Sequence, residues 1–155
     1  MKSPFFLRGD NTEYSIIIDE VRGKGRPRAT TIGGRPHLYT DKKTAEYEKK
    51  IKETFIQKYP DFSPLKCCVK VQLIINQKIP ANAKKDDKRA MLSGDVYVNK
   101  KPDIDNVIKS ALDGLTGVAW IDDTQVMDIT ARKAWGLVDR MHIIITPTRE
   151  DDPND

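Results

Sequence analysis

The chain has 155 residues, of which 38% are hydrophobic and 32% are charged. This length suits one domain, and the composition excludes a wholly disordered chain. The formal net charge is +4, but the last seven residues carry −3, so residues 1–148 carry +7 and suggest a polyanionic partner.

Three further classes are disfavoured. No stretch approaches the roughly 18 apolar residues of a membrane span, and the N-terminus lacks the apolar core of a secretion signal. The two cysteines, Cys67 and Cys68, are adjacent and lack the partners of a zinc site. We therefore expect a cytoplasmic protein with no membrane contact and no small-molecule cofactor.

The first half of the chain predicts a strand, a loop and a helix. Residues 14–19 (YSIIID) are rich in β-forming residues, and residues 21–37 are dense in Gly, Pro and Arg. Residues 41–59 then place apolar side chains at near-helical spacing before Pro60. We expect a strand, a loop and a helix in that order.

The second half predicts two helices between strands. Residues 67–79 alternate as a strand does, residues 83–92 form a short basic helix that ends at Gly94, and residues 105–116 form an amphipathic helix closed by Gly117. Residues 124–135 and 140–146 predict two strands joined as an antiparallel hairpin.

This order, β-α-β-α-α-β-β, predicts a single α+β domain in which helices pack on a mixed β-sheet. We assign residues 1–148 to the domain and expect residues 149–155 to be a disordered acidic tail.

Acidic residues gather in and around the last predicted helix: Asp103, Asp105, Asp113, Asp122, Asp123 and Asp128. Carboxylates that share one fold repel one another unless cations compensate them, and hard oxygen ligands suit magnesium or manganese. Asp113 and Asp128 are interpreted as bystanders.

Spacing places several of these groups together. Asp103 and Asp105 are two residues apart, so they share one side of an extended chain, and Lys109 lies one helical turn beyond Asp105. Of Asp122 and Asp123, which follow that helix, only one can point inward to complete a metal shell. Such a set suits metal-assisted phosphodiester cleavage, with Lys109 stabilising the developing charge.

Each aspartate taken alone also fits an ordinary structural role. Asp103 or Asp105 could cap a helix, and Asp122 and Asp123 could form a solvated turn. The combination of DxDN, a lysine four residues later and Asp-Asp-x-Gln before a strand favours the metal site.

Residues 101–126, KPDIDNVIKSALDGLTGVAWIDDTQV, resemble the signature of the RusA family of Holliday-junction resolvases, which prophages commonly carry. The early segment with GKGRPR and TAEYE is similar to the N-terminal part of the family. The resemblance implies metal-binding aspartates at Asp103, Asp105 and Asp123, a catalytic Lys109, and a supporting Asp122 that we include as a candidate ligand.

The resemblance further implies an α+β subunit that forms homodimers with two active sites. Such dimers use Mg²⁺, which Mn²⁺ can replace, to make paired symmetric nicks in four-way DNA junctions during recombination and repair. A two-fold dimer matches a substrate with two equivalent strands.

Basic residues offer phosphate contacts at three places. Lys24, Arg26 and Arg28 lie in the Gly/Pro loop, and Lys101 adjoins the acidic set. The predicted basic helix adds four more cations: Lys84, Lys85, Lys88 and Arg89. For that helix a merely solvated basic face is an equal alternative.

Two rival functions stay open. A junction-binding protein without catalysis would explain the basic charge but not the carboxylates. A less selective nuclease acting on flaps or other branched DNA would use the same chemistry.

Overall fold

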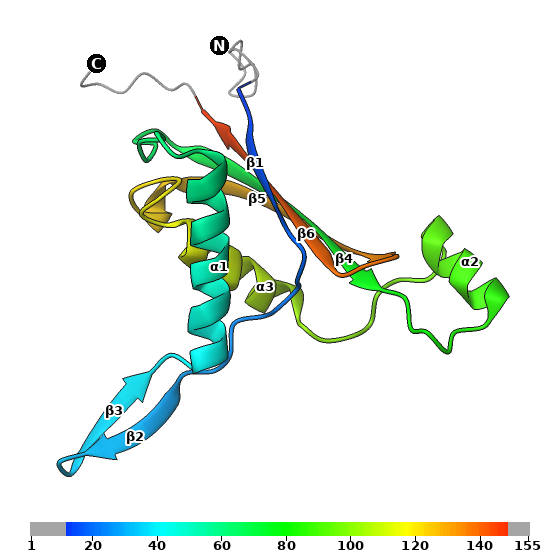
Figure 1. Ribbon diagram of the computed structural model, residues 1–155, viewed down its shortest axis with the longest axis horizontal. Coiled ribbons are helices and arrows are strands. Elements are labelled where there is room, and N and C mark those ends of the chain that lie inside the picture. The colour runs from blue at the N-terminus through cyan, green and yellow to red at the C-terminus, as the bar shows by residue number, and fades with distance from the viewer. Residues whose placement is uncertain (1–11, 149–155) are drawn as a thin grey trace, which may run out of the picture.

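The computed structural model describes residues 12–148, and its centre is a four-stranded mixed sheet (Figure 1). The strands are β1 (Tyr14–Ile18), β4 (Val69–Lys78), β5 (Val126–Gly136) and β6 (Arg140–Pro147), in the order β1-β6-β4-β5. β6 is antiparallel to both β1 and β4, whereas β4 and β5 are parallel. The expected α+β class with a mixed sheet is confirmed.

The predicted hairpin of the last two strands is wrong, because β4 lies between β5 and β6. The connection from β5 to β6 passes over the end of β4, where two backbone amides donate hydrogen bonds to it. The Ile79 amide donates to the Gly136 carbonyl at 3.0 Å, and the Lys78 amide donates to Asp139 Oδ1 at 2.8 Å. Both predicted strands exist, but each is paired with β4.

Two helices pack on one face of the sheet. They are α1 (Lys42–Lys58) and α3 (Ile104–Leu115), and each predicted boundary lies within one residue of the observed one. Alternate residues of the strands face these helices and form one buried core with them. The helical side chains in that core include Tyr47, Ile51, Phe55, Val107, Ala111 and Leu115.

The short basic helix α2 (Lys85–Ser93) lies apart from α1 and α3, at the opposite end of β4 from Val69 (Figure 1). It ends as predicted at Gly94, whose φ of 85 places it in the left-handed region that glycine tolerates. Within the described residues, no helix combines the length and the apolar character that crossing a membrane requires.

The segment predicted as a loop contains a second, two-stranded sheet. β2 (Arg28–Ile32) and β3 (Arg35–Tyr39) form an antiparallel hairpin that projects away from the sheet (Figure 1). Gly33 and Gly34, with φ of 58 and 77, form its two-residue turn. The β-branched residues before Gly33-Gly34 are typical of a hairpin strand, but the Pro and Arg residues around them favoured the interpretation as a loop. The predicted acidic tail lies outside the described residues.

Candidate active site

The start of α3 carries two of the predicted metal ligands. Asp103 is the N-cap residue but makes no side-chain capping bond, and its carboxylate instead accepts from Lys101 Nζ at 2.6 Å. Asp105 lies in the first turn, with its carboxylate 3.9 Å from Lys109 Nζ. All four side chains are at least half exposed. The carboxylates are therefore open to solvent and to a large substrate, and their charges are balanced by lysines.

Two side chains from the sheet hold the segment that leads into Asp103. Gln77 of β4 donates to the Lys101 carbonyl at 2.8 Å, and Lys133 of β5 donates to the carbonyls of Lys100 and, at 3.0 Å, Pro102. Gln77 is buried, so this contact lies in the interior. Sequence reasoning missed both residues, because nothing in a strand pattern reports which distant carbonyl a polar side chain will meet.

The segment before the hairpin packs against the first turn of α3. The Lys24 amide donates to the Asn106 carbonyl at 2.9 Å, and the Gly25 amide donates to Thr44 Oγ1 at 3.1 Å. At Gly23 a Cβ would come within 2.9 Å of the Asn106 side chain. Two backbone amides of this Gly/Pro segment are thus bonded within the protein and are not free to bind phosphates.

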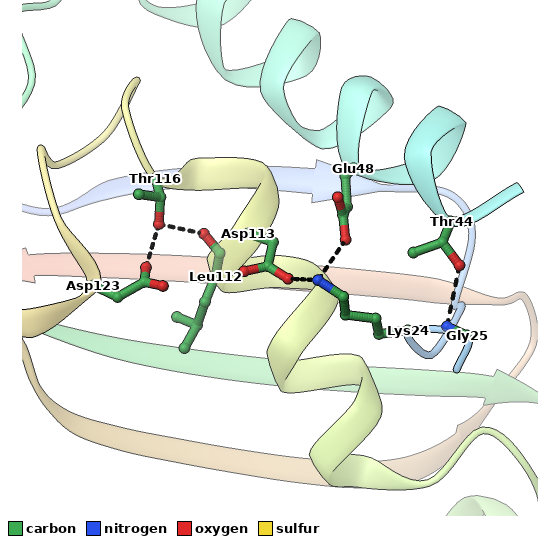
Figure 2. A network of polar contacts seen from close by, with 8 residues as sticks. All are labelled: Lys24, Gly25, Thr44, Glu48, Leu112, Asp113, Thr116 and Asp123. Atoms are coloured by element: carbon green, nitrogen blue, oxygen red, sulfur yellow. Dashed lines mark hydrogen bonds and ion pairs between the residues drawn. The ribbon is translucent and has the colours of Figure 1, made fainter. Parts of the chain in front are cut away.

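Lys24, which is predicted to contact DNA, pairs with two carboxylates of the protein (Figure 2). Its ammonium pairs with Asp113 of α3 and lies 3.4 Å from Glu48 of α1. The hydrogen bond to Asp113 and the charge of Glu48 raise the pKa of Lys24 despite partial burial. Lys24 therefore joins the two helices, and Asp113, set aside as a bystander, has a structural partner.

Asp123 lies at the other end of α3 from Asp103. Its carboxylate accepts a hydrogen bond from the hydroxyl of Thr116, the C-cap residue of the helix (Figure 2). N-cap and C-cap of this helix are about 20 Å apart at a rise of ~1.5 Å per residue. Two oxygens bound to one magnesium ion are at most about 4 Å apart, since each is ~2.1 Å from the metal.

Asp122 and Gln125 stabilise the short 3-10 helix Asp123–Gln125. Asp122 Oδ1 accepts from the Thr124 amide at 2.9 Å, and this bond lowers the pKa of Asp122. Gln125 accepts from the Asp122 amide at 2.8 Å and donates to the Leu65 carbonyl at 2.7 Å. The Asp122 carboxylate is thus occupied by a local cap, while that of Asp123 points toward Thr116.

The expected metal site is therefore split within one chain. Asp103 and Asp105 lie together, Asp123 does not join them, and among residues 12–148 no three acidic, His or Cys side chains are grouped closely enough to hold a metal ion. One chain supplies two carboxylates at the start of α3, and a magnesium ion held by so few carboxylates takes its other ligands from water and substrate phosphates.

The remaining predicted DNA contacts fall in two separate regions. Arg26 and Arg28 lie at the base of the β2–β3 hairpin, where Arg28 is 3.1 Å from Asp41. The four cations of the basic segment lie on or beside α2, far from that hairpin (Figure 1). Lys101 lies beside Asp103 and lines one cavity with Gly25 and Asp41 at the base of the hairpin. The predicted contacts thus do not form one compact patch.

A model of the family described as "Endodeoxyribonuclease RusA" matches residues 20–146. The chain belongs to the RusA family. It is also similar to "Uncharacterized protein YqaN" of Bacillus subtilis (strain 168), with 26% identity over 132 residues, which cover 83% of this chain and 92% of the relative. The region matched to the RusA family contains every site residue discussed above.

Proposed function

We propose that this RusA-family chain is a metal-dependent DNA endonuclease that resolves four-way junctions by paired nicks. The observation that carries the proposal is the exposed pair Asp103 and Asp105 at the start of α3, with Lys109 one turn further along the helix. A magnesium or manganese ion bound there would activate water and stabilise the leaving oxygen of a phosphodiester.

Side chains of the protein would stabilise the developing charge, neutralise the DNA and position the carboxylates. Lys109, now paired with Asp105, is free to turn toward the phosphate and stabilise the charge that develops on it. Lys101, which pairs with Asp103 in the free protein, would neutralise a neighbouring phosphate when DNA binds. Gln77 and Lys133 keep the backbone before Asp103 in place, so that its carboxylate is already positioned when DNA binds.

The separation of Asp123 from Asp103 supports a homodimer as the active form. Since about 20 Å of helix divides these residues within one chain, a second copy would have to bring its Asp123 to the Asp103 and Asp105 of the first. Two-fold symmetry would then produce two identical sites, one for each strand to be cut. Dimerisation and metal binding would be coupled.

The direct test is cleavage of a fluorescent four-way junction in Mg²⁺ by the full chain and by the variants D103N, D105N, D123N and K109A. We expect wild type to make paired nicks, the Asp variants to lose cleavage, and K109A to slow it by about 10²–10³-fold. A panel of flap, linear duplex and junction substrates separates a resolvase from a less selective nuclease.

The matched control is D128N, which alters an exposed aspartate in β5. It should cut at the wild-type rate. The proposal fails if wild type binds junctions without cutting them in Mg²⁺ or Mn²⁺, or if D105N cuts as fast as wild type.

A further inference from the structure

The β2–β3 hairpin has two chemically different faces. Residues directly opposite each other in an antiparallel pair share a face, and the faces alternate along each strand. The register therefore places six residues together, which we call the basic face: Arg28, Thr30, Ile32, Arg35, His37 and Tyr39. The reverse face, which we call the small face, consists of Ala29, Thr31, Pro36 and Leu38.

Every residue of both strands is exposed, including Ile32 at 61% and Leu38 at 68%. A lone two-stranded hairpin is marginally stable in water, so an extended hairpin of this kind gains stability when something binds to it. The electrostatics identify the partner. Residues 21–40 contain five Lys and Arg residues and no Asp or Glu. Arg22, Lys24 and Arg28 pair with carboxylates outside this segment, whereas Arg35 on the basic face has no carboxylate within ion-pair distance in the described residues. The hairpin therefore presents positive charge without negative charge of its own, so the partner should be anionic.

The base of the hairpin adjoins the candidate active site. Gly23 and Gly25 line one cavity with Lys101 and Pro102, and Asp103 follows directly in the chain. The Lys24 amide is bonded to the first turn of α3. A duplex whose scissile phosphate lies at Asp103 would therefore pass close to where the hairpin begins.

The dimensions also match. Each strand has five residues and spans roughly 17 Å, which corresponds to about five base pairs along a duplex. The major groove of B-form DNA is wide enough to admit a two-stranded ribbon. The Gly33-Gly34 turn at the tip carries no side chain that would obstruct close approach to the backbone.

We propose that the β2–β3 hairpin is a DNA-binding arm that places its basic face in the major groove of the duplex beside the cleavage site. Arg28 and Arg35 would contact phosphates or guanine edges, and Thr30, His37 and Tyr39 would add hydrogen bonds. This inference rests on the proposed nuclease function for its substrate, but it concerns binding rather than cleavage.

The sequence offers a matched pair of variants in Thr30 and Thr31. These neighbours are the same residue type, both are exposed, and they lie on opposite faces of the ribbon. T30E adds a negative charge to the basic face and should weaken binding of a fluorescein-labelled four-way junction, measured in EDTA, by tenfold or more. T31E adds the same charge to the small face and should change binding by less than about twofold.

The salt dependence gives a second readout. R35A should weaken binding and lower the slope of log affinity against log salt by about one, which is the signature of one lost phosphate contact. Methyl green, a major-groove ligand, should abolish the difference between wild type and T30E, whereas the minor-groove ligand distamycin should preserve it. Cleavage by T31E under saturating single-turnover conditions should equal that of wild type, because Thr31 lies on the small face.

Three outcomes would overturn the inference. T30E and T31E could bind junctions equally well, or distamycin rather than methyl green could remove their difference. Alternatively, T30E could change the molar mass of the free protein, which would make a second copy of the chain the occupant of the basic face. If T30E bound junctions as tightly as wild type while D105N failed to cut them, the DNA-binding arm would be rejected and the nuclease function kept. If wild type bound junctions without cutting them, only the nuclease function would be rejected.

Discussion

Lys133 is expected to position Asp103 by holding the backbone that precedes it, and a substitution at Lys133 tests this role. It donates to the carbonyls of Lys100 and Pro102, directly before Asp103, and touches none of the carboxylates in the described structure. We expect K133M to lower kcat on the junction by about tenfold while KM changes little, since a misplaced group costs rate rather than binding.

K133R should recover part of that rate, because arginine can still donate to both carbonyls. K52M, the same kind of change on the exposed surface of α1, is the control and should keep wild-type kinetics. A rise in KM without a fall in kcat would assign Lys133 to DNA binding instead.

Tyr47 links stability to alkaline pH. Burial raises its pKa from 10.0 to about 12, and its hydroxyl donates to the Glu20 carbonyl at 2.9 Å. The folded protein holds this proton more tightly than the unfolded chain. The contribution is therefore complete below pH 10 and is lost as pH rises toward 12, by up to about 2–3 kcal/mol at ~1.4 kcal/mol per pKa unit.

Urea unfolding of wild type and Y47F at a series of pH values from 9 upward measures this effect. The free energy of unfolding should fall more steeply above pH 10 in wild type than in Y47F. Y97F, a change at an exposed tyrosine, should follow wild type. Parallel curves for wild type and Y47F would contradict the assignment.

At the scale of elements, the close crossing of α1 and α3 depends on Gly114. A Cβ at this position would lie 2.8 Å from Ile51 Cβ and 3.1 Å from the Glu48 carbonyl oxygen. Alanine is the better helix former by about 1 kcal/mol, but the overlap with α1 should outweigh that gain.

We therefore expect G114A to lower the free energy of unfolding by about 1–3 kcal/mol, as measured by urea denaturation. K52A, on the exposed face of α1, should change it by no more than about 0.5 kcal/mol. A G114A variant at least as stable as wild type would show that the helices can move apart at little cost.

At the scale of the whole molecule, the split carboxylate set makes the dimer testable by mixing inactive variants. A heterodimer of D105N and D123N would retain one intact site, formed by Asp105 of the D123N chain and Asp123 of the D105N chain. Mixed and refolded together, these variants should regain nicking of one strand per junction.

D103N mixed with D105N is the matched control, because both changes lie at the start of α3 and no combination restores an intact site. Recovery in neither mixture would mean that each active site is built within one chain, which would require a large rearrangement around Thr116 and Asp123.

Several features followed from local sequence. The helices and the main strands were predicted because hydrophobic periodicity depends on neighbours along the chain, and Gly94 ends α2 by its own backbone freedom. The pairing of Asp105 with Lys109 followed from the same helical spacing. Family membership followed from residues 101–126, whose short motif needs no knowledge of distant contacts.

Other features were decided only by tertiary structure. Strand order is set by packing between distant segments, so β4 lies between two strands that are neighbours in sequence. Lys24 is bound to Asp113, 89 residues away, and Gln77 and Lys133 meet carbonyls that no local pattern identifies. Asp103 and Asp123 belong to one sequence motif, but α3 runs between them. The rise of that helix therefore places Asp123 one helix length from Asp103.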